Sequence, residues 1–273
     1  MILERGSEFS ELSVQRCCRA CGVPRSMVYR KAGQTPGGAL LEAVLRVLER
    51  FPCYGYRRVA WALGLTLKKA RTFMKRHGLV RKQRVRSRPS GSSAYVPSDA
   101  NLLPFLEVRG PARAFASDVT YIRVQGGRWA YLAVVLDIFT RQVVGWAISR
   151  RNDTELTKAA LTMMLASRPV IPGWVHHSDR GSNYAAGAFQ ELVETFDGLC
   201  SFSDPASPIQ NAYVESFFKT FKLEEANSQV YADVKDVQLA TGRYLTLYNT
   251  ERLHSSLGMK SPDQFYAECK RAS

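Results

Sequence analysis

The pattern of apolar and polar residues changes about two-fifths of the way along the chain. Before residue 80, apolar positions recur at helical spacing, as in Leu41, Val44, Leu45 and Leu48. From about residue 113, runs rich in β-branched and aromatic residues alternate with helical stretches, which is typical of strands and helices in one sheet-based domain. The pattern therefore predicts an all-α front part followed by an α/β part.

The first segment, ACGVPRSMVYRK and its surroundings in residues 8–31, predicts a helix-turn-helix. Gly22 permits a sharp turn, and Pro24 suits the first turn of the second helix. In that arrangement Arg25, Arg30 and Lys31 would reach the major groove of DNA. A helical hairpin without a DNA role is the alternative.

A second helical module is predicted in residues 39–80. One of its helices ends near Gly64, and the next runs between a Thr66 cap and Gly78. This last helix has too many cations for a buried face, so we expect it to contact DNA. The module cations expected to do so are Arg57, Arg58, Lys68, Lys69, Arg71 and Lys75.

The α/β part has a predicted order of three strands, a helix, a strand, a helix, a strand and a helix. The first three strands follow each other through short turns and predict an antiparallel meander. The expected elements are strands at 114–124, 128–140, 142–149, 173–179 and 199–203, and helices at 154–167, at 186–197, from about 207, and at 233–249 before a polar tail. The expected domains are a helix-turn-helix-like segment at 1–33, the helical module at 39–80, a basic linker at 81–110, a catalytic core at 111–230, and a C-terminal helix and tail at 231–273.

The net charge of +14 is unevenly distributed along the chain. Residues 1–110 hold 21 Lys and Arg against 7 Asp and Glu, whereas residues 111–273 hold 17 of each. Clustered cations neutralise phosphates and release counterions, so the front part is predicted to bind nucleic acid. No apolar run is long enough to span a membrane and no secretion signal begins the chain, so a cytoplasmic protein is expected.

Three carboxylates lie at positions where a charged side chain is unfavourable alone or where ligands commonly bind. Asp118 lies inside the first predicted strand, where an unpaired charge is costly, and Asp179 lies where the fourth strand ends. Glu215 lies mid-helix on a polar stripe with Asn211, Lys219 and Lys222, separate from the buried apolar face of that helix. Alone, Glu215 and Lys219 would form an ordinary surface ion pair.

Together, the three acids predict a metal site. Gathered carboxylates repel one another, and divalent cations remove that cost. Oxygen-only ligands favour magnesium, or manganese in its place, and two such ions suit phosphoryl transfer. We therefore expect Asp118, Asp179 and Glu215 to be both catalytic and metal-binding, with Lys219 and Lys222 contacting DNA. Asn211 would either contact DNA as well or orient the helix that carries Glu215.

The sequence also resembles a known family. Thirty-five residues separate Asp179 from Glu215, and Lys222 follows seven residues later, as in retroviral integrases and related bacterial transposases. The blocks SDVTYI, HHSDRGSNY, NAYVESFFKTFKLE and YNTERLHSSLGMKSPDQF, in this order, resemble the second-reading-frame product of the bacterial insertion-sequence family conventionally numbered three. The resemblance covers nearly the whole chain and is strongest from about residue 113 to 266.

This resemblance implies a ribonuclease-H-like fold, a mixed five-stranded sheet flanked by helices, and a triad of two Asp and one Glu. It implies a DNA transposase that cuts and joins strands at the terminal repeats of its element, working as a homo-oligomer on double-stranded DNA. It leaves open whether the chain acts alone or as a fusion with a first-frame DNA-binding product. The alternatives are a non-catalytic DNA-binding regulator, and a ribonuclease-H-type nuclease that does not join strands.

Four further residues are weighed against the triad. Asp137 ends a strand, where capping a turn is the commoner role. His177 could approach the metal or DNA, although a structural histidine is favoured, and His254 is interpreted as holding the C-terminal tail. Tyr213 would serve a tyrosine recombinase, but the cluster of Arg and His that such an enzyme needs is not recognisable.

Overall fold

The computed structural model describes residues 38–80, 100–204 and 211–272 of the chain. The predicted helix-turn-helix, with Arg25, Arg30 and Lys31, lies outside the described residues. So do residues 81–99 of the predicted linker.

The helical module contains α3 (Gly38–Arg50), α4 (Tyr56–Ala62) and α5 (Leu67–Arg76). Thr66 caps α5 by accepting a hydrogen bond at its hydroxyl from the Lys69 amide, 3.3 Å away. Gly64 and Gly78 follow α4 and α5 with φ of 61° and 67°, a backbone conformation that glycine adopts without strain. The predicted helix boundaries are thus confirmed in this module.

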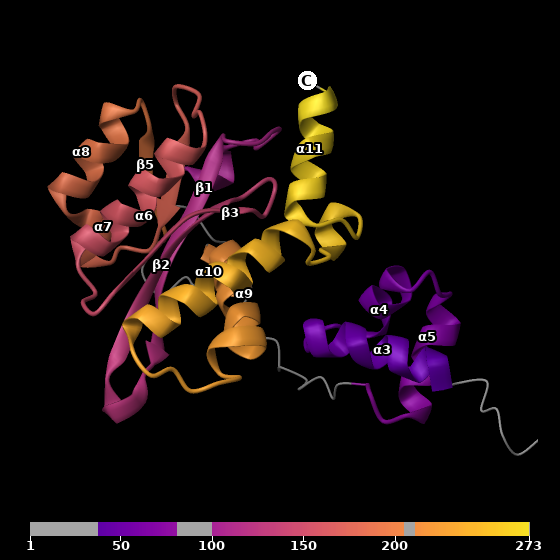
Figure 1. Cartoon of the computed structure of the whole chain (residues 1–273). Coiled ribbons are helices and arrows are strands. Elements are labelled where there is room, and N and C mark those ends of the chain that lie inside the picture. The colour runs from indigo at the N-terminus through magenta and orange to yellow at the C-terminus, as the bar shows by residue number, and fades with distance from the viewer. Residues whose placement is uncertain (1–37, 81–99, 205–210, 273) are drawn as a thin grey trace, which may run out of the picture. The chain divides into compact units, whose positions relative to one another are not determined.

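A five-stranded mixed sheet forms the centre of the second part (Figure 1). Its spatial order is β3-β2-β1-β4-β5, with β1, β2 and β3 antiparallel and with β4 and β5 parallel to β1. The predicted antiparallel meander and the predicted order of the strands along the chain are confirmed. The strands are β1 (Ala114–Arg123), β2 (Trp129–Asp137), β3 (Val143–Ser149), β4 (Val175–Ser178) and β5 (Leu199–Phe202).

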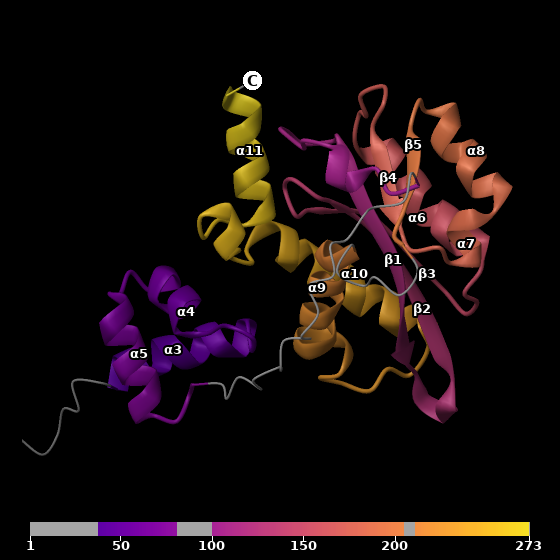
Figure 2. The same cartoon turned by 180° about the vertical axis from the view of Figure 1, so that it is seen from behind.

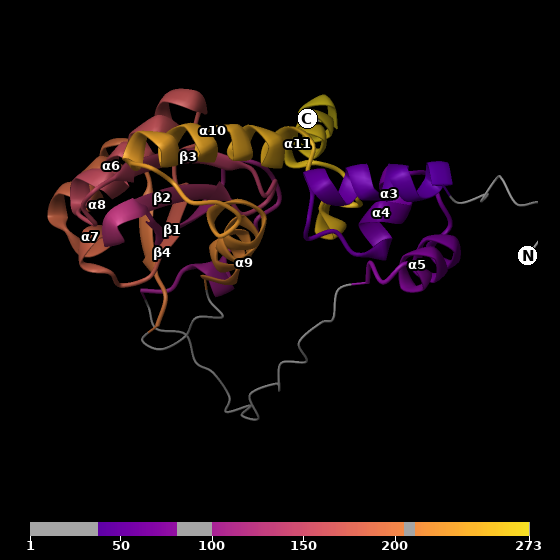
Figure 3. The same cartoon turned by 60° about the horizontal axis from the view of Figure 1, so that its bottom comes forward.

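Helices cover both faces of this sheet, as the views in Figure 2 and Figure 3 show. One hydrophobic cluster joins a sheet face to α9 and α10, and a second joins the other face to α6 and α8. The helices are α6 (Thr154–Ser167), α7 (Ser182–Ala185), α8 (Gly187–Thr195), α9 (Ala212–Phe221), α10 (Val234–Thr250) and α11 (Pro262–Ala272). None of the helices in the described ranges is long and apolar enough to cross a membrane.

The C-terminal tail differs from its prediction, because residues 262–272 form helix α11. The cause is local. The Ser261 hydroxyl accepts from the Gln264 amide at 3.3 Å, and the Gln264 side chain accepts from the Ser261 amide at 3.0 Å. This reciprocal pair is a capping box, and Pro262 takes the first helical position, where its missing N–H costs nothing.

Strand alternation decides which side chains of β1 face which helices. Ala114, Ala116 and Ile122 belong to the cluster with α9 and α10, whereas Phe115 belongs to the cluster with α6 and α8. Because successive strand residues point to opposite faces, Asp118 faces the α9 side.

Candidate active site

Asp118 and Asp179 come from neighbouring parallel strands. The β1–β4 pairing runs from Ala114 with Val175 to Ala116 with His177. Asp118 lies two residues beyond the last pair on β1 and Asp179 two residues beyond it in the segment that follows β4, and the negative charge of Asp179 raises the pKa of Asp118. Val175, at the start of β4, belongs to the cluster with α9.

Helix α9 brings Glu215 to that side of the sheet. Its buried face, Val214, Phe217, Phe218 and Phe221, packs into the cluster shared with β1, as the apolar spacing predicts. Asn211 stands immediately before the helix, and its side-chain amide donates to the backbone oxygen of Ser117 at 3.0 Å. Glu215 is exposed and follows Asn211 by one turn on the same stripe. Asn211 therefore fixes the start of α9 beside the residue that precedes Asp118.

Electrostatics show that the three acids influence one another. Burial, helped by the negative charges of Asp179 and Glu215, raises the pKa of Asp118 from its ordinary 3.8 to about 7, although the Val119 amide and Lys222 oppose the rise. Asp118 is half-buried, whereas Asp179 and Glu215 are exposed. Ionising all three acids of such a site is unfavourable unless a cation binds between them.

The carboxylates are not arranged as a finished metal cage. Among the described residues, no group of three His, Cys, Asp or Glu is placed to hold a metal ion. Asp118 and Asp179 each use one oxygen locally, accepting from the amides of Val119 at 2.7 Å and Gly181 at 3.0 Å.

Lys222 lies near the acids, and the structure adds a residue that the sequence did not indicate. The Lys222 ammonium stands 4.5 Å from the centre of the Tyr121 ring, three residues after Asp118 on β1. Tyr121 is exposed and packs edge-on against Trp129. No pattern in the sequence pairs Tyr121 with Lys222, because the contact joins a strand to a distant helix end. Lys219 is exposed and is held by no ion pair among the described residues.

The rival acid Asp137 has the turn-capping role. It is fully buried, and its carboxylate accepts from the amides of Ala112, Phe139 and Thr140 at 2.8 to 3.0 Å. Arg168 also pairs with it at 3.7 Å. These bonds satisfy Asp137 inside the fold.

His177 is held inside the structure by β5 and the residue after it. Its two ring nitrogens lie 2.8 Å from the Ser201 hydroxyl and 3.0 Å from the Ser203 hydroxyl. Burial lowers its pKa to about 4. The structural interpretation of this histidine is therefore supported.

Comparisons with known proteins now identify the family. Models of integrase core domains match residues 109–208 and 199–262. The chain is 30% identical to the transposase InsF of insertion sequence IS3A from Escherichia coli (strain K12), over 94% of each chain. It belongs to the IS3 family of insertion-sequence transposases. The transposase of IS904 from Lactococcus lactis subsp. lactis (strain IL1403) is 32% identical over 64% of this chain and 68% of that protein.

Solved structures were also compared with this IS3-family chain. The simian T-cell lymphotropic virus intasome in complex with PP2A regulatory subunit B56 gamma gives a TM-score of 0.46 at 16% identity, over 82% of this chain and 74% of that one. The HTLV-2 integrase catalytic core domain in complex with magnesium gives 0.42 at 16% identity, over 58% and 98%.

Family membership establishes what this chain does. It is a DDE transposase, which cuts and joins DNA strands at the ends of an insertion element, and its sheet is the ribonuclease-H-like sheet of integrase cores. The acid site described above lies in the matched core.

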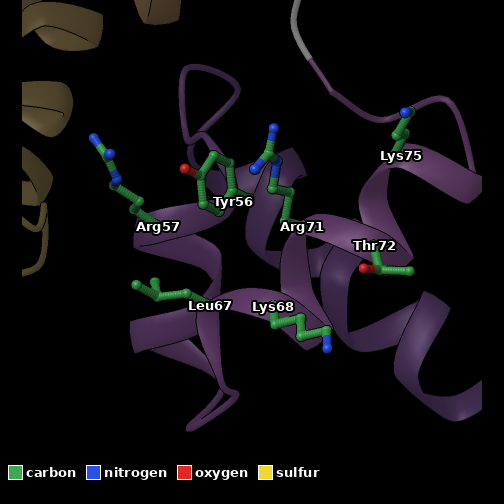
Figure 4. A pocket seen from close by; sticks show the side chains of 7 residues that line it. All are labelled: Tyr56, Arg57, Leu67, Lys68, Arg71, Thr72 and Lys75. Carbon is green, nitrogen blue, oxygen red and sulfur yellow. The ribbon is translucent and has the colours of Figure 1, made fainter.

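The IS3-family chain also carries a basic pocket of about 540 Å³ between α4 and α5 (Figure 4). Its walls bring together four of the predicted DNA-binding cations and no acid. Arg71 lies beside the Tyr56 ring, 5.8 Å from its centre, as Figure 4 shows. The lining residues are Tyr56, Arg57, Leu67, Lys68, Arg71, Thr72 and Lys75.

Two predicted module cations are not among the lining residues. Lys69 is exposed elsewhere on α5. Arg58 is half-buried, with its guanidinium 5.6 Å from the centre of the Tyr54 ring. Burial lowers its pKa. Arg58 is therefore less available to DNA than the exposed Lys69.

Proposed function

We propose that Asp118, Asp179 and Glu215 hold two magnesium ions at which this transposase cuts and joins DNA. The observation that supports the proposal is the mutual influence of the acids: the negative charges of Asp179 and Glu215 both raise the pKa of Asp118, and the β1–β4 pairing ends two residues before the two aspartates. The pKa of Asp118, raised to about 7, supports it, because a bound cation would stabilise the ionised carboxylate that burial and the neighbouring acids destabilise.

The donor set fits magnesium. It contains only carboxylate oxygens, which hard cations prefer, and two of the three acids lie on a strand and a helix that support them. When bound, the two ions would activate the attacking oxygen and stabilise the departing one. Manganese has the same ligand preference and would substitute.

The remaining side chains would position the DNA. Lys219 and Lys222, on the same stripe as Glu215, would neutralise phosphates next to the scissile bond. Asn211 would act as a positioning residue, because its bond to the Ser117 carbonyl sets where Glu215 stands relative to Asp118. Tyr121 would hold the Lys222 ammonium in place.

The helical module would grip DNA through the pocket between α4 and α5. Residues 51–80 hold seven Lys and Arg and no Asp or Glu, which suits a polyanion. Together with the predicted helix-turn-helix, this module would recognise the terminal repeats of the element. Binding two ends at once would call for a homo-oligomer, and a first-frame product, fused or separate, would add further contacts.

The test uses a labelled duplex that carries the terminal repeat of the element, with magnesium present. Asp118→Asn, Asp179→Asn and Glu215→Gln should each abolish nicking and joining while the protein still binds the duplex. The matched control is Glu191→Gln, which changes an exposed acid on α8 in the same way. If any of the three variants cuts as well as the control, that residue is not part of the site.

The products separate the alternative functions. Joined strands identify a transposase reaction, nicks without joined strands a nuclease, and binding without either a regulator. Arg71→Gln should weaken duplex binding and lower the salt dependence of binding by about one phosphate contact, without changing cleavage at saturating DNA.

A further inference from the structure

A second pocket, of about 300 Å³, lies on another side of helix α9. Tyr213 and Ser216 line it from α9, and Arg141 from the turn between β2 and β3. Arg252 and His254, from the segment after α10, also line the pocket. These last two belong to the sequence block YNTERLHSSLGMKSPDQF, which the acid site does not use.

The pocket and the acid site share one helix but not one face. Tyr213, Ser216 and Thr220 follow one another at helical spacing and line the pocket. At about 100° per residue, this stripe and the stripe of Asn211 and Glu215 lie on opposite flanks of the buried apolar face. A ligand in the pocket would therefore contact a different side of α9 from the side that carries Glu215.

Arg141 has a free donor in this pocket. Its backbone adopts φ of 62°, which is uncommon for a residue with a side chain, and its guanidinium stacks 4.0 Å from the centre of the Tyr213 ring. Its Nη1 atom is buried and donates to no acceptor, and no carboxylate of the described residues forms an ion pair with it. Buried guanidinium N–H groups are normally satisfied, so this one calls for an acceptor.

The surroundings of Arg141 add a polar atom without a partner and no free acid. The Nε2 atom of His254 is also buried without a hydrogen-bond partner. Burial, and then the positive charges of Arg252 and other nearby arginines, lower the pKa of His254 to about 3. Glu224 is fully engaged, since Arg252 binds both its oxygens at 2.9 and 3.0 Å. The pocket therefore has an excess of positive charge and of hydroxyl groups.

We propose that this pocket binds a phosphate group, with the Arg141 guanidinium as its main ligand and the Ser216 and Tyr213 hydroxyls beside it. Phosphate fits because a planar guanidinium presents two parallel N–H donors to two oxygens of one anion. The phosphate comes either from a DNA strand that passes behind α9 or from a free phosphate or nucleotide.

The experiment measures binding by the full chain without divalent ions, so its result does not depend on the acid site. One arm follows the affinity for a dye-labelled duplex by fluorescence anisotropy at several salt concentrations. The other follows the melting temperature in inorganic phosphate and in chloride at equal ionic strength. The variants are Arg141→Gln, Arg141→Lys and Ser216→Asp, with Arg271→Gln on α11 as the matched control. Ser216 is exposed on its helix, so Ser216→Asp tests the pocket even if Arg141→Gln impairs folding.

For a DNA phosphate, Arg141→Gln and Ser216→Asp should weaken duplex binding severalfold and reduce the salt slope by about 0.9. Arg141→Lys should keep most of the slope, because it keeps the charge. For a free phosphate, the duplex data stay unchanged, but the rise in melting temperature caused by phosphate is lost in both variants. If both variants match Arg271→Gln in both arms, the pocket binds no phosphate and the proposal is overturned.

Discussion

The unusual pKa of Asp118 makes a quantitative prediction about the metal-free protein. Burial, helped by Asp179 and Glu215, raises this pKa from 3.8 to about 7. Since a tenfold change in proton affinity corresponds to about 1.4 kcal/mol, ionised Asp118 costs the folded state roughly 4 kcal/mol, as an upper value. A raised pKa means that the folded state holds its proton more tightly than the unfolded chain. The stability that this provides is present below about pH 4 and is lost as the pH rises to 7 and above.

Asp118→Asn removes the titration and keeps the shape of the side chain. The difference in free energy of unfolding between variant and wild type should therefore grow by up to roughly 4 kcal/mol from pH 4 to pH 8, in favour of the variant. Buried histidines with lowered pKa, such as His176 at about 3, lose stability in the opposite direction, as the pH falls below 6.5. They are the same in both proteins, so the difference isolates Asp118.

The assay is urea unfolding followed by tryptophan fluorescence, in chelator, at several pH values. Asp197→Asn is the matched control, because Asp197 is exposed and its φ of 54° suits asparagine. Adding magnesium at about a hundred times its dissociation constant should restore about 2.7 kcal/mol to the wild type at pH 8 and much less to Asp118→Asn. A difference between variant and wild type that stays constant from pH 4 to pH 8 would refute the reasoning.

Three further predictions concern the fold and the site. Gly145→Ala should lower the free energy of unfolding by about 2–3 kcal/mol, because a Cβ there would stand 2.2 Å from a backbone oxygen of α6. Gly187→Ala is the control and should not lower it, because the space around Gly187 is open. Urea titration compares the two variants. Glu224→Ala should cost roughly 3–5 kcal/mol in the same titration, because it leaves the buried Arg252 unpaired, and a loss below 1 kcal/mol would contradict this. Asn211→Ala should lower the rate of strand cutting at saturating DNA more than it lowers DNA affinity, and an equal loss in both would argue against a positioning role.

Much of the core follows from local sequence signals. The strands of the meander follow from runs of β-branched and aromatic residues joined by short turns, and the capping by Thr66 follows from one hydroxyl before a helical stretch. Helix α11 was missed although its capping box, Ser261 to Gln264, is legible in the sequence, because the polar composition of this segment hid its start.

The contacts that complete the site could not be predicted in this way. The pairing of β1 with β4 joins residues about sixty positions apart through the crossover helix α6, and only the folded sheet shows that the charge of Asp179 acts on Asp118. The bonds from Asn211 to the Ser117 carbonyl and from His177 to two serines are likewise tertiary. Residue types alone indicate the metal chemistry, whereas the fold decides which polar residues serve it.

The anchoring of Asn211 divides the three acids into a fixed pair and an adjustable partner. Asp118 and Glu215 are tied together, since the side chain that begins α9 is bonded to the strand residue just before Asp118. Asp179 lies past the last paired residues of β4, in a turn closed by the Gly181 amide. When the spacing between acids must change during a reaction cycle, we expect this short turn to move while the strand and helix stay still.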